Sequence, residues 1–512
     1  MFVKSFCCAL SGIRAVTVAV EVNISSGIGM FLVGLPDNAV RESQERIRAA
    51  FENSHYKMSG RKVVVNLSPA DLRKEGSVYD LSIAMAILGA TGQLESERLK
   101  RYMILGELSL DGSVLPVKGA LPAALEAREQ GFDSLILPQG NAREAAVVEG
   151  INIYGIRSLR EAVDVLQGTS DIHPTRIELK EEFDSRKTQF DCDFSEVKGQ
   201  FQAKRALEIA AAGGHNVLMI GPPGSGKTML ARRMSTIVPP MTLAEALETT
   251  KIHSVAGKLG RQTGLLTTRP FRAPHHLASQ VSLIGGGSTP QPGEISLAHN
   301  GILFLDELPE FGRNLLETLR QPMENKSVLV SRSRYAVEYP ANFMLIAAMN
   351  PCPCGYYNHP TKACVCPPGA VYKYLNRISG PLLDRIDLQI EVTPVSLDEL
   401  QTQQPPESSA TIRRRVMAAR DIQTQRLAGS GIHTNAMMSS RQMQEFCALD
   451  AASSRLLREA MERLELSARA YDRILKVART IADLAGQPSI EPGHIAEAIR
   501  YRSLDRSNWG AH

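Results

Sequence analysis

One short segment has the residue types and spacing of a phosphate-binding loop. It follows the apolar run 217–220, precedes a helix-forming stretch, and consists of Gly221, Pro222, Pro223, Gly224, Ser225, Gly226, Lys227 and Thr228. Glycines let successive backbone N–H groups surround a phosphate, and a helix that starts at the loop adds its positive end. The lysine of such a loop reaches the β- and γ-phosphates, and the threonine ligates Mg²⁺. This phosphate loop therefore predicts binding of ATP with Mg²⁺.

Three further polar residues follow apolar strand-like runs and could complete a hydrolysis site. The run 302–305 ends in Asp306 and Glu307. At the carboxyl end of a parallel strand, Asp306 would hold the Mg²⁺ shell and Glu307 would deprotonate the attacking water. A second run, 343–349, ends in Asn350, whose amide could position that water. The alternative for Asn350 is a capping role in the turn that follows.

Four of the eight cysteines lie close together in the sequence. They are Cys352, Cys354, Cys364 and Cys366. Four thiolates suit tetrahedral Zn²⁺, so we expect a zinc site that braces the loop after Asn350. The alternatives are four unligated thiols, or a site in which His359 replaces one cysteine. The remaining cysteines are isolated or have apolar neighbours, and we expect them to be structural.

Composition limits the possible classes of protein. The chain has 512 residues, of which 43% are hydrophobic and 22% charged, as in globular proteins with several domains. The formal net charge is only +4, so any contact with nucleic acid must come from local basic patches. No run approaches membrane-spanning length and the first residues do not resemble a signal peptide, so we expect a cytoplasmic protein without a membrane partner.

The order of elements predicts an α/β multidomain protein. Residues 1–168 alternate strand-like runs (16–22 and 62–67) with helical runs (81–89 and 121–131), which indicates an α+β unit. The polar stretch 169–193 suits a linker. Residues 194–393 form the nucleotide-binding α/β unit, and 394–512 a helical lid that begins with a flexible loop near 401–409.

Two segments are candidates for contact with DNA. Residues 327–339 alternate as a β-hairpin would, with Arg332 and Arg334 at the tip, where they could grip phosphates. The alternative is a solvated basic turn. The irregular stretch from Arg269 to His276 is the second candidate, and its alternative is an ordinary polar loop.

The motifs of residues 194–393 resemble those of the AAA+ ATPases. Residues 194–200 are similar to the segment that wraps the adenine in that family, and 379–388 resembles the branch that contains magnesium-chelatase ATPase subunits and MCM helicases. The resemblance implies an arginine finger, Arg385, inserted into a neighbouring subunit's nucleotide site, and hence a ring. The alternative is a surface ion pair. It also implies a second sensor in the lid, at Arg469 or, as the second choice, Arg473.

The amino-terminal unit resembles the Lon-protease-like (ribosomal-protein-like) fold. Alignment on its motifs puts Asp80 at the nucleophilic serine position and Leu121 at the lysine position, and neither residue can act in that chemistry. A displaced pair formed by Lys118 with Ser77 or Ser82 is the alternative. We therefore expect a domain that is inactive as a protease.

With these domains in this order, the chain resembles the YifB/ComM family over nearly its whole length. The resemblance implies a DNA helicase, a homo-oligomer with a hexameric ring, that acts on single-stranded and branched duplex DNA. It also implies branch migration in homologous recombination during natural transformation, with recombination proteins as possible partners. A magnesium-chelatase motor subunit and an ATP-dependent protein remodeller or protease are the alternatives.

Overall fold

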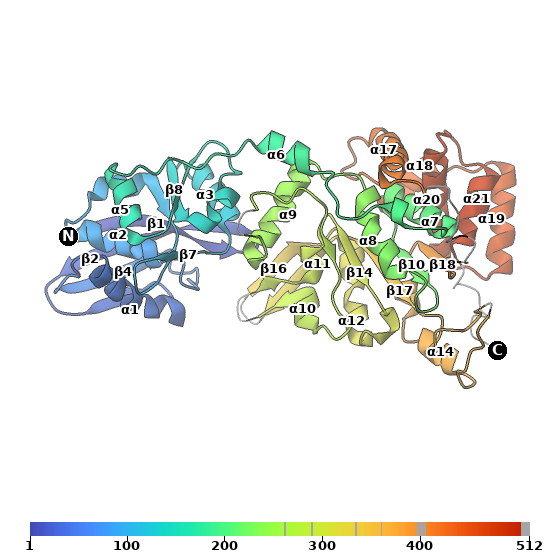
Figure 1. Cartoon of the computed structure of the whole chain (residues 1–512), viewed down its shortest axis with the longest axis horizontal. Coiled ribbons are helices and arrows are strands. Elements are labelled where there is room, and N and C mark those ends of the chain that lie inside the picture. Colours follow the sequence, from blue (N-terminus) through green and yellow to red (C-terminus); the bar gives the residue numbers. More distant parts are fainter. Residues whose placement is uncertain are drawn as a thin grey trace.

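The protein has three successive parts along its length (Figure 1). The computed structural model describes residues 1–260, 263–287, 290–332, 335–359, 361–395, 399 and 406–502. A mixed α/β unit lies at one end, a parallel sheet with its helices lies in the middle, and a group of helices lies at the other end. Within the described residues, no helix has the length and apolar character needed to cross a membrane.

The amino-terminal unit is built on a seven-stranded sheet in the order β3-β4-β2-β1-β5-β8-β9. The wholly buried, apolar helix α2 packs against β1 and β2. The strands and helices that we expected at 16–22, 62–67, 81–89 and 121–131 are confirmed within β2, β4, α2 and α3. The elements are β1 (Phe2–Ser11), β2 (Arg14–Ser25), β3 (Met30–Val33), α1 (Asn38–Asn53), β4 (Lys62–Ser68), α2 (Asp80–Ala90), β5 (Tyr102–Ile104), β6 (Glu107–Leu108), β7 (Val114–Leu115), α3 (Ala120–Glu129), β8 (Ser134–Pro138), α4 (Ala142–Ala145), β9 (Asn152–Ile156) and α5 (Leu159–Gln167).

The segment that we expected to act as a linker, 169–193, contains ordered structure. It forms helix α6 (Leu179–Arg186), and Phe183 on this helix is buried in the amino-terminal core. The Thr175 N–H donates to the carbonyl of Ile153 at 2.8 Å, which covers the edge of β9. Apolar residues spaced through a polar stretch thus hold this connection against the first unit.

The central unit is a five-stranded parallel sheet in the order β11-β14-β17-β10-β18. Its strands alternate between two apolar cores, because side chains in a strand point to opposite faces: Val217 of β10 lies in one core and Leu218 in the other. The elements are α7 (Phe201–Gly213), β10 (Val217–Ile220), α8 (Lys227–Ile237), α9 (Leu243–Ala256), β11 (Phe271–Arg272), α10 (Gln280–Ile284), β12 (Gly285–Gly286), β13 (Gln291–Pro292), α11 (Glu294–Leu297), β14 (Ile302–Leu305), α12 (Arg313–Thr318), α13 (Arg320–Asn325), β15 (Ser327–Arg332), β16 (Tyr335–Pro340), β17 (Met344–Met349), α14 (Ala370–Leu375), α15 (Gly380–Leu383) and β18 (Leu388–Glu391).

The strand order determines which polar residues meet. Strand β17 lies between β10, which leads into the phosphate loop, and β14, which ends at Asp306. Because all these strands are parallel, their carboxyl ends share one edge of the sheet, with Asn350 between the phosphate loop and Asp306.

Among the described residues of the carboxy-terminal part, five α-helices share one apolar core with the face of the sheet that α7 and α8 cover. Side-chain caps start several of them, including Ser408 before α17 and Ser467 before α20. Residues 401–405 of the expected flexible loop lie outside the described residues. The helices are α17 (Ser409–Arg426), α18 (Ser440–Phe446), α19 (Ala451–Arg463), α20 (Ala468–Leu484) and α21 (Pro492–Arg500).

Helix α9 joins the first two units. Ala246 on this helix is buried in the amino-terminal core, together with Met241 just before it. The Ser254 hydroxyl donates to the buried carboxylate of Glu144, and its carbonyl accepts from the N–H of Gly119 at 3.2 Å. The contact between the units is therefore both apolar and hydrogen-bonded.

Candidate nucleotide-binding site

The phosphate loop adopts the cradle that its glycines permit. Gly226 has a φ of 89° and starts helix α8, so the helix N-terminus faces into the loop. At Gly221 there is no room for a side chain, because a Cβ would lie 2.3 Å from the carbonyl oxygen of Val392. The Lys227 Nζ donates to the carbonyls of Gly221 and Pro222 at 2.7 and 3.0 Å. Burial lowers the pKa of Lys227.

The other predicted hydrolysis residues meet at the same edge of the sheet. The Thr228 hydroxyl donates to Oδ2 of Asp306 at 2.7 Å, so the two expected Mg²⁺ ligands are neighbours. Lys227 Nζ also donates to Oδ1 of Asn350 at 3.2 Å. Glu307 follows directly, with a left-handed backbone (φ 52°) that bends the chain out of β14. The arrangement brings together the lysine, the threonine–carboxylate pair and the second carboxylate that we predicted to bind phosphate, to ligate Mg²⁺ and to act as a general base.

His276 lies near Glu307, the predicted general base. It was not among the hydrolysis residues that we predicted from the sequence. Its Nδ1 lies 3.2 Å from Oε2 of Glu307. The imidazole is fixed by the ring of His275, at a centroid distance of 4.1 Å, and by the edge of Phe311, at 6.4 Å. The signal in the sequence was the histidine pair after the short strand β11, which we interpreted as part of a DNA-binding loop.

The arginines of that stretch have partners within the chain. Arg269 donates to the carbonyls of Pro239 and Asn300, at 2.6 and 2.7 Å, and pairs with Glu245 at 3.1 Å. Arg272 pairs with Glu294 through two hydrogen bonds of 2.6 and 2.7 Å. A contact of this stretch with DNA stays a prediction.

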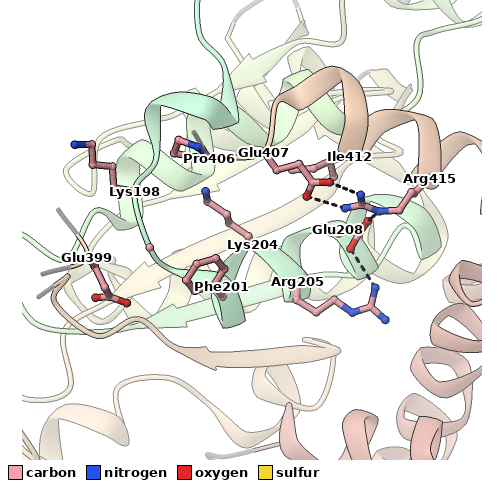
Figure 2. A pocket seen from close by; sticks show the side chains of 11 residues that line it. Lys198, Phe201, Lys204, Arg205, Glu208, Glu399, Pro406, Glu407, Ile412 and Arg415 are labelled. Carbon is pink, nitrogen blue, oxygen red and sulfur yellow. Dashed lines mark hydrogen bonds and ion pairs between the residues drawn. The ribbon is translucent and has the colours of Figure 1, made fainter. Parts of the chain in front are cut away.

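A cavity of about 330 Å³ lies beside the phosphate loop (Figure 2). Gln200 links the two, because its amide donates to the carbonyls of Ser225 and Thr393 at 3.3 and 2.6 Å. Phe201 and Ile412 give the cavity apolar walls, and charged side chains form much of its rim. It is lined by Lys198, Gly199, Phe201, Lys204, Arg205, Glu208, Glu399, Pro406, Glu407, Ile412 and Arg415.

The predicted arginine finger lies at the opposite edge of the sheet from the phosphate loop. The carbonyl of Arg385 accepts from the Asn216 side chain at 3.1 Å, and Asn216 comes directly before β10. The four residues of β10 span about 13 Å between that edge and the phosphate loop. The Arg385 side chain is almost buried, pairs with Glu324, and has no hydrogen-bond partner at Nε among the described residues.

Both lid arginines lie on the same amino side of the sheet. Arg473 Nη1 is 2.8 Å from Oδ1 of Asp387, and Arg469 Nη1 is 3.6 Å from Oδ2 of Asp384. A cavity of about 430 Å³ at this edge is lined by Arg385 and Arg473 among others. Neither lid arginine is therefore at the phosphate loop of its own chain.

The expected hairpin is present. Strands β15 and β16 pair antiparallel, with Ser327 opposite Pro340 and Arg332 opposite Tyr335. The Arg332 side chain and all of Arg334 lie outside the described residues, so the role predicted for them stays a prediction.

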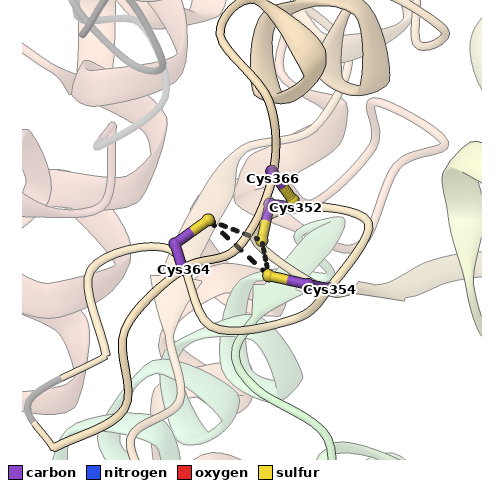
Figure 3. A group of neighbouring side chains, drawn as sticks. All are labelled: Cys352, Cys354, Cys364 and Cys366. Carbon is purple, nitrogen blue, oxygen red and sulfur yellow. Dashed lines mark hydrogen bonds between the residues drawn. The ribbon is translucent and has the colours of Figure 1, made fainter.

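The four clustered cysteines come together after β17 (Figure 3). The sulfur of Cys352 lies 3.3 Å from that of Cys354 and 3.8 Å from that of Cys364, and Cys354 and Cys364 are 3.6 Å apart. Neighbouring sulfurs in a tetrahedral zinc site are about 3.8 Å apart, so the spacing fits a metal. His359 Nδ1 instead accepts from the N–H groups of Thr361 and Lys362, at 3.2 and 3.1 Å.

The amino-terminal unit has no Ser–Lys pair at the positions considered. Asp80 is buried and bound by Arg46 through contacts of 2.6 and 3.0 Å; burial raises the pKa of Asp80 to about 6. The Ser82 hydroxyl donates to the Tyr79 carbonyl and the Ser77 hydroxyl to Glu107. The side chain of the third candidate, Lys118, lies over Gly257 of the central unit.

The fold and the site define a nucleotide-binding protein of the magnesium-chelatase, AAA+-like class. The family model described as magnesium chelatase, subunit ChlI, matches residues 193–400. Models described as subunit ChlI of Mg-chelatase and as the ChlI C-terminal region match residues 20–141 and 406–502.

Full-length relatives narrow this class. The chain is 45% identical to the competence protein ComM of Haemophilus influenzae over 505 residues, 97% of each chain. It is 44% identical to YifB of Escherichia coli over 504 residues, 97% of this chain and 96% of that one. The 67 kDa magnesium-chelatase subunit of Chlorobaculum tepidum is 27% identical over 164 residues, 31% of this chain and 23% of that one. The chain therefore belongs to the YifB/ComM family of magnesium-chelatase-like proteins.

Proposed function

We propose that the protein is a ring-forming ATPase that uses ATP hydrolysis to move along DNA. The observation that carries the proposal is the separation of Lys227 and Arg385 at opposite edges of one sheet. An arginine at the amino edge cannot reach the γ-phosphate bound at the carboxyl edge of the same chain. A complete site then needs the cradle of one subunit and the arginine of the next, which is the geometry of a closed ring.

Within one subunit, each residue at the carboxyl edge has a distinct part in hydrolysis. Lys227 binds the β- and γ-phosphates, and Thr228 and Asp306 hold Mg²⁺. Glu307 removes a proton from the attacking water, and Asn350 orients that water. The cavity takes the nucleoside, since Gln200, which precedes Phe201 of its wall, donates to the Ser225 carbonyl of the phosphate loop. Mg²⁺ supplies charge neutralisation at the phosphates.

Between subunits, the cations come from arginines at the edge of the sheet where its strands begin, and they act at the nucleotide site of the neighbouring subunit. Arg385 stabilises the charge of the transition state at the neighbour's γ-phosphate. Its present partner Glu324 is half exposed, so exchange for a phosphate costs little desolvation. Arg469, whose side chain is exposed, is the second cation, with Arg473 as the alternative.

DNA is the proposed cargo, gripped in the ring by Arg332 and Arg334 at the tip of the β15–β16 hairpin. Two observations support this. The hairpin is formed and its base is anchored, because the buried Tyr339 donates its hydroxyl to the Pro290 carbonyl at 2.8 Å. A relative that matches nearly the whole chain is named as a competence protein. We therefore propose branch migration of recombining DNA during natural transformation, by a hexamer.

The cysteine cluster and the amino-terminal unit complete the proposal. The four cysteines hold structural Zn²⁺, which fits their sulfur separations. The amino-terminal unit is an inactive Lon-protease-like domain, since the buried carboxylate of Asp80 occupies the position of the nucleophile.

The test is ATPase activity of the full chain without DNA and with single-stranded, duplex or three-stranded DNA, together with the mass of the assembly. We expect a closed oligomer whose turnover rises with DNA. The double variant Arg332→Ala, Arg334→Ala should keep its basal turnover and lose both the stimulation and strand displacement. DNA that never stimulates turnover, or a double variant that displaces strands as wild type does, would reject the DNA role.

A further inference from the structure

We propose that metal binding by the four-cysteine cluster controls the rate of ATP hydrolysis, because the loop that it closes supports both the phosphate loop and Asn350. This inference rests on the proposed ATPase function and extends it. The metal then acts on turnover at the nucleotide site, beyond holding a surface loop together.

The segment between β17 and α14 carries all four cysteines, and we call it the cysteine loop. The first support is a contact between this loop and the phosphate loop. Gly355, between the two cysteine pairs, has a φ of 85° and donates its N–H to the Cys352 carbonyl at 3.0 Å. This turn lies directly on Pro223, since a Cβ at Gly355 would be 2.5 Å from Cδ of that proline. A bulkier residue would therefore push the turn and the phosphate loop apart.

The second support is at the other end of the loop. Tyr374 on α14 is nearly buried, and its hydroxyl lies close to the backbone N–H of Asn350. Asn350 in turn accepts from Lys227 through its side chain. The chain therefore leaves the nucleotide site at Asn350, passes through all four cysteines and returns to Asn350.

The third support is the lack of any other framework in this loop. Between β17 and α14, the described residues form turns and irregular chain, with no helix or strand. Cys352 is fully buried whereas the other three cysteines are partly exposed, so the cluster bridges the protein interior and the outer chain. Ordering such a segment costs conformational entropy, and four metal–thiolate bonds would offset that cost.

Loss of the metal should affect ATP binding and ATP hydrolysis to different extents. The nucleoside cavity beside Gln200 has no lining residue from the cysteine loop. Loss of the metal should therefore loosen Asn350 and Pro223 and lower kcat, and it should change ATP affinity less than kcat because the contacts of the nucleoside remain in place. Mutation of the hydrogen-bond partners that orient the ligands of a metal site typically changes metal affinity or activity by about 10- to 100-fold, and we expect an effect of this size here.

The experiment uses the full-length protein without DNA, so that its outcome does not depend on the DNA role. Bound zinc is measured by a chromophoric chelator, and Co²⁺ substitution provides a thiolate absorption signature that is independent of activity. The Kd for a fluorescent ATP analogue and kcat are then measured for metal-loaded, metal-stripped and metal-restored wild type. We expect one metal per chain, a fall in kcat of about tenfold or more on stripping, a smaller change in Kd, and recovery on restoration.

Two variants separate metal binding from its transmission. Cys354→Ser with Cys366→Ser should lose both metal and turnover, whereas Cys192→Ser, a cysteine outside the cluster, should lose neither. Gly355→Ala should keep its metal, because all four cysteines are intact, and still lose turnover, because the added Cβ strains this left-handed turn and pushes it away from Pro223. Wild type that binds no metal, or metal-stripped protein with an unchanged kcat, would overturn the proposal. A basal ATPase that is absent even in the metal-loaded form would instead reject the proposed function.

Discussion

Arg473 on α20 and the buried carboxylate of Asp387, just before β18, form an ion pair with 2.8 Å between Nη1 and Oδ1. The second oxygen of Asp387 accepts from the N–H of Asn216 at 3.0 Å and lies 3.4 Å from Nδ1 of His215. One carboxylate therefore fixes the lid, the start of β10 and the strand that follows Arg385.

We expect Asp387→Asn to destabilise the protein in a pH-dependent way. Burial raises the pKa of Asp387, but Arg473 and His215 more than offset this and hold it below its ordinary value. The stabilisation is therefore complete above the unfolded pKa of about 3.9 and is lost as the pH falls further. Breaking such a pair costs about 3–5 kcal/mol at neutral pH.

The check is the midpoint of urea unfolding, monitored by circular dichroism, at pH 7 and at a pH below about 3.9. The difference in midpoint between wild type and variant should be smaller at the lower pH, because only there does Asp387 begin to take up its proton. Asp384→Asn, which removes only the exposed contact with Arg469, is the matched control and should change little. An equal gap at both pH values would contradict the assignment.

The variant Glu307→Gln should bind ATP and fail to turn it over. The amide keeps the size of the side chain but cannot accept the proton of the attacking water, which typically costs about 10²- to 10⁴-fold in kcat. Nucleotide binding and single-turnover hydrolysis measure the two effects separately. Glu310→Gln, a nearby exposed carboxylate paired with Arg377, is the control. Full turnover in Glu307→Gln would show that another group is the base.

His276→Ala should lower kcat more than it changes ATP affinity. His276 Nδ1 lies 3.2 Å from Oε2 of Glu307, so the imidazole can fix the orientation of this carboxylate. His276→Asn should restore much of the rate, because its amide can donate from nearly the position of Nδ1. Steady-state kinetics of both variants provide the comparison. Equal losses in Ala and Asn variants, with weaker ATP binding, would indicate a packing role instead.

Mixing two inactive variants should restore activity. Lys227→Ala lacks the phosphate-binding cation and Arg385→Ala lacks the proposed finger, so each homo-oligomer should lose most of its turnover. In an equal, random mixture, about a quarter of the interfaces combine an intact cradle with an intact finger. The measurement is ATPase activity against the mixing ratio. Activity that never exceeds that of the separate variants would argue against a shared site.

The parts of the site that lie at strand ends could be predicted from the sequence, because each depends on short-range patterns. The phosphate loop, Asp306 and Asn350 follow apolar runs, and parallel strands bring such ends together. The hairpin at 327–340 was predictable for the same reason, since alternation is a local signal.

Contacts between distant segments were not predictable in this way. Nothing local in the sequence connects His276 with Glu307, or Arg385 with Glu324, which are 61 positions apart. The partners of Arg269 could not be predicted either, because Glu245 and the carbonyls of Pro239 and Asn300 come from distant segments. Likewise, the polarity of 169–193 concealed the few apolar side chains, such as Phe183, that attach it to the first unit.

The burial of α9 in the amino-terminal core also bears on how the chain can be dissected. A truncation at the boundary suggested by sequence would strip Met241 and Ala246 of their apolar cover and leave Ser254 without Glu144. Such a fragment would expose an apolar surface on the nucleotide-binding unit. Its measured activity would therefore reflect aggregation as well as catalysis. Because apolar and hydrogen-bonded contacts join the two units, we expect the amino-terminal unit to move together with the nucleotide-binding unit and not independently of it.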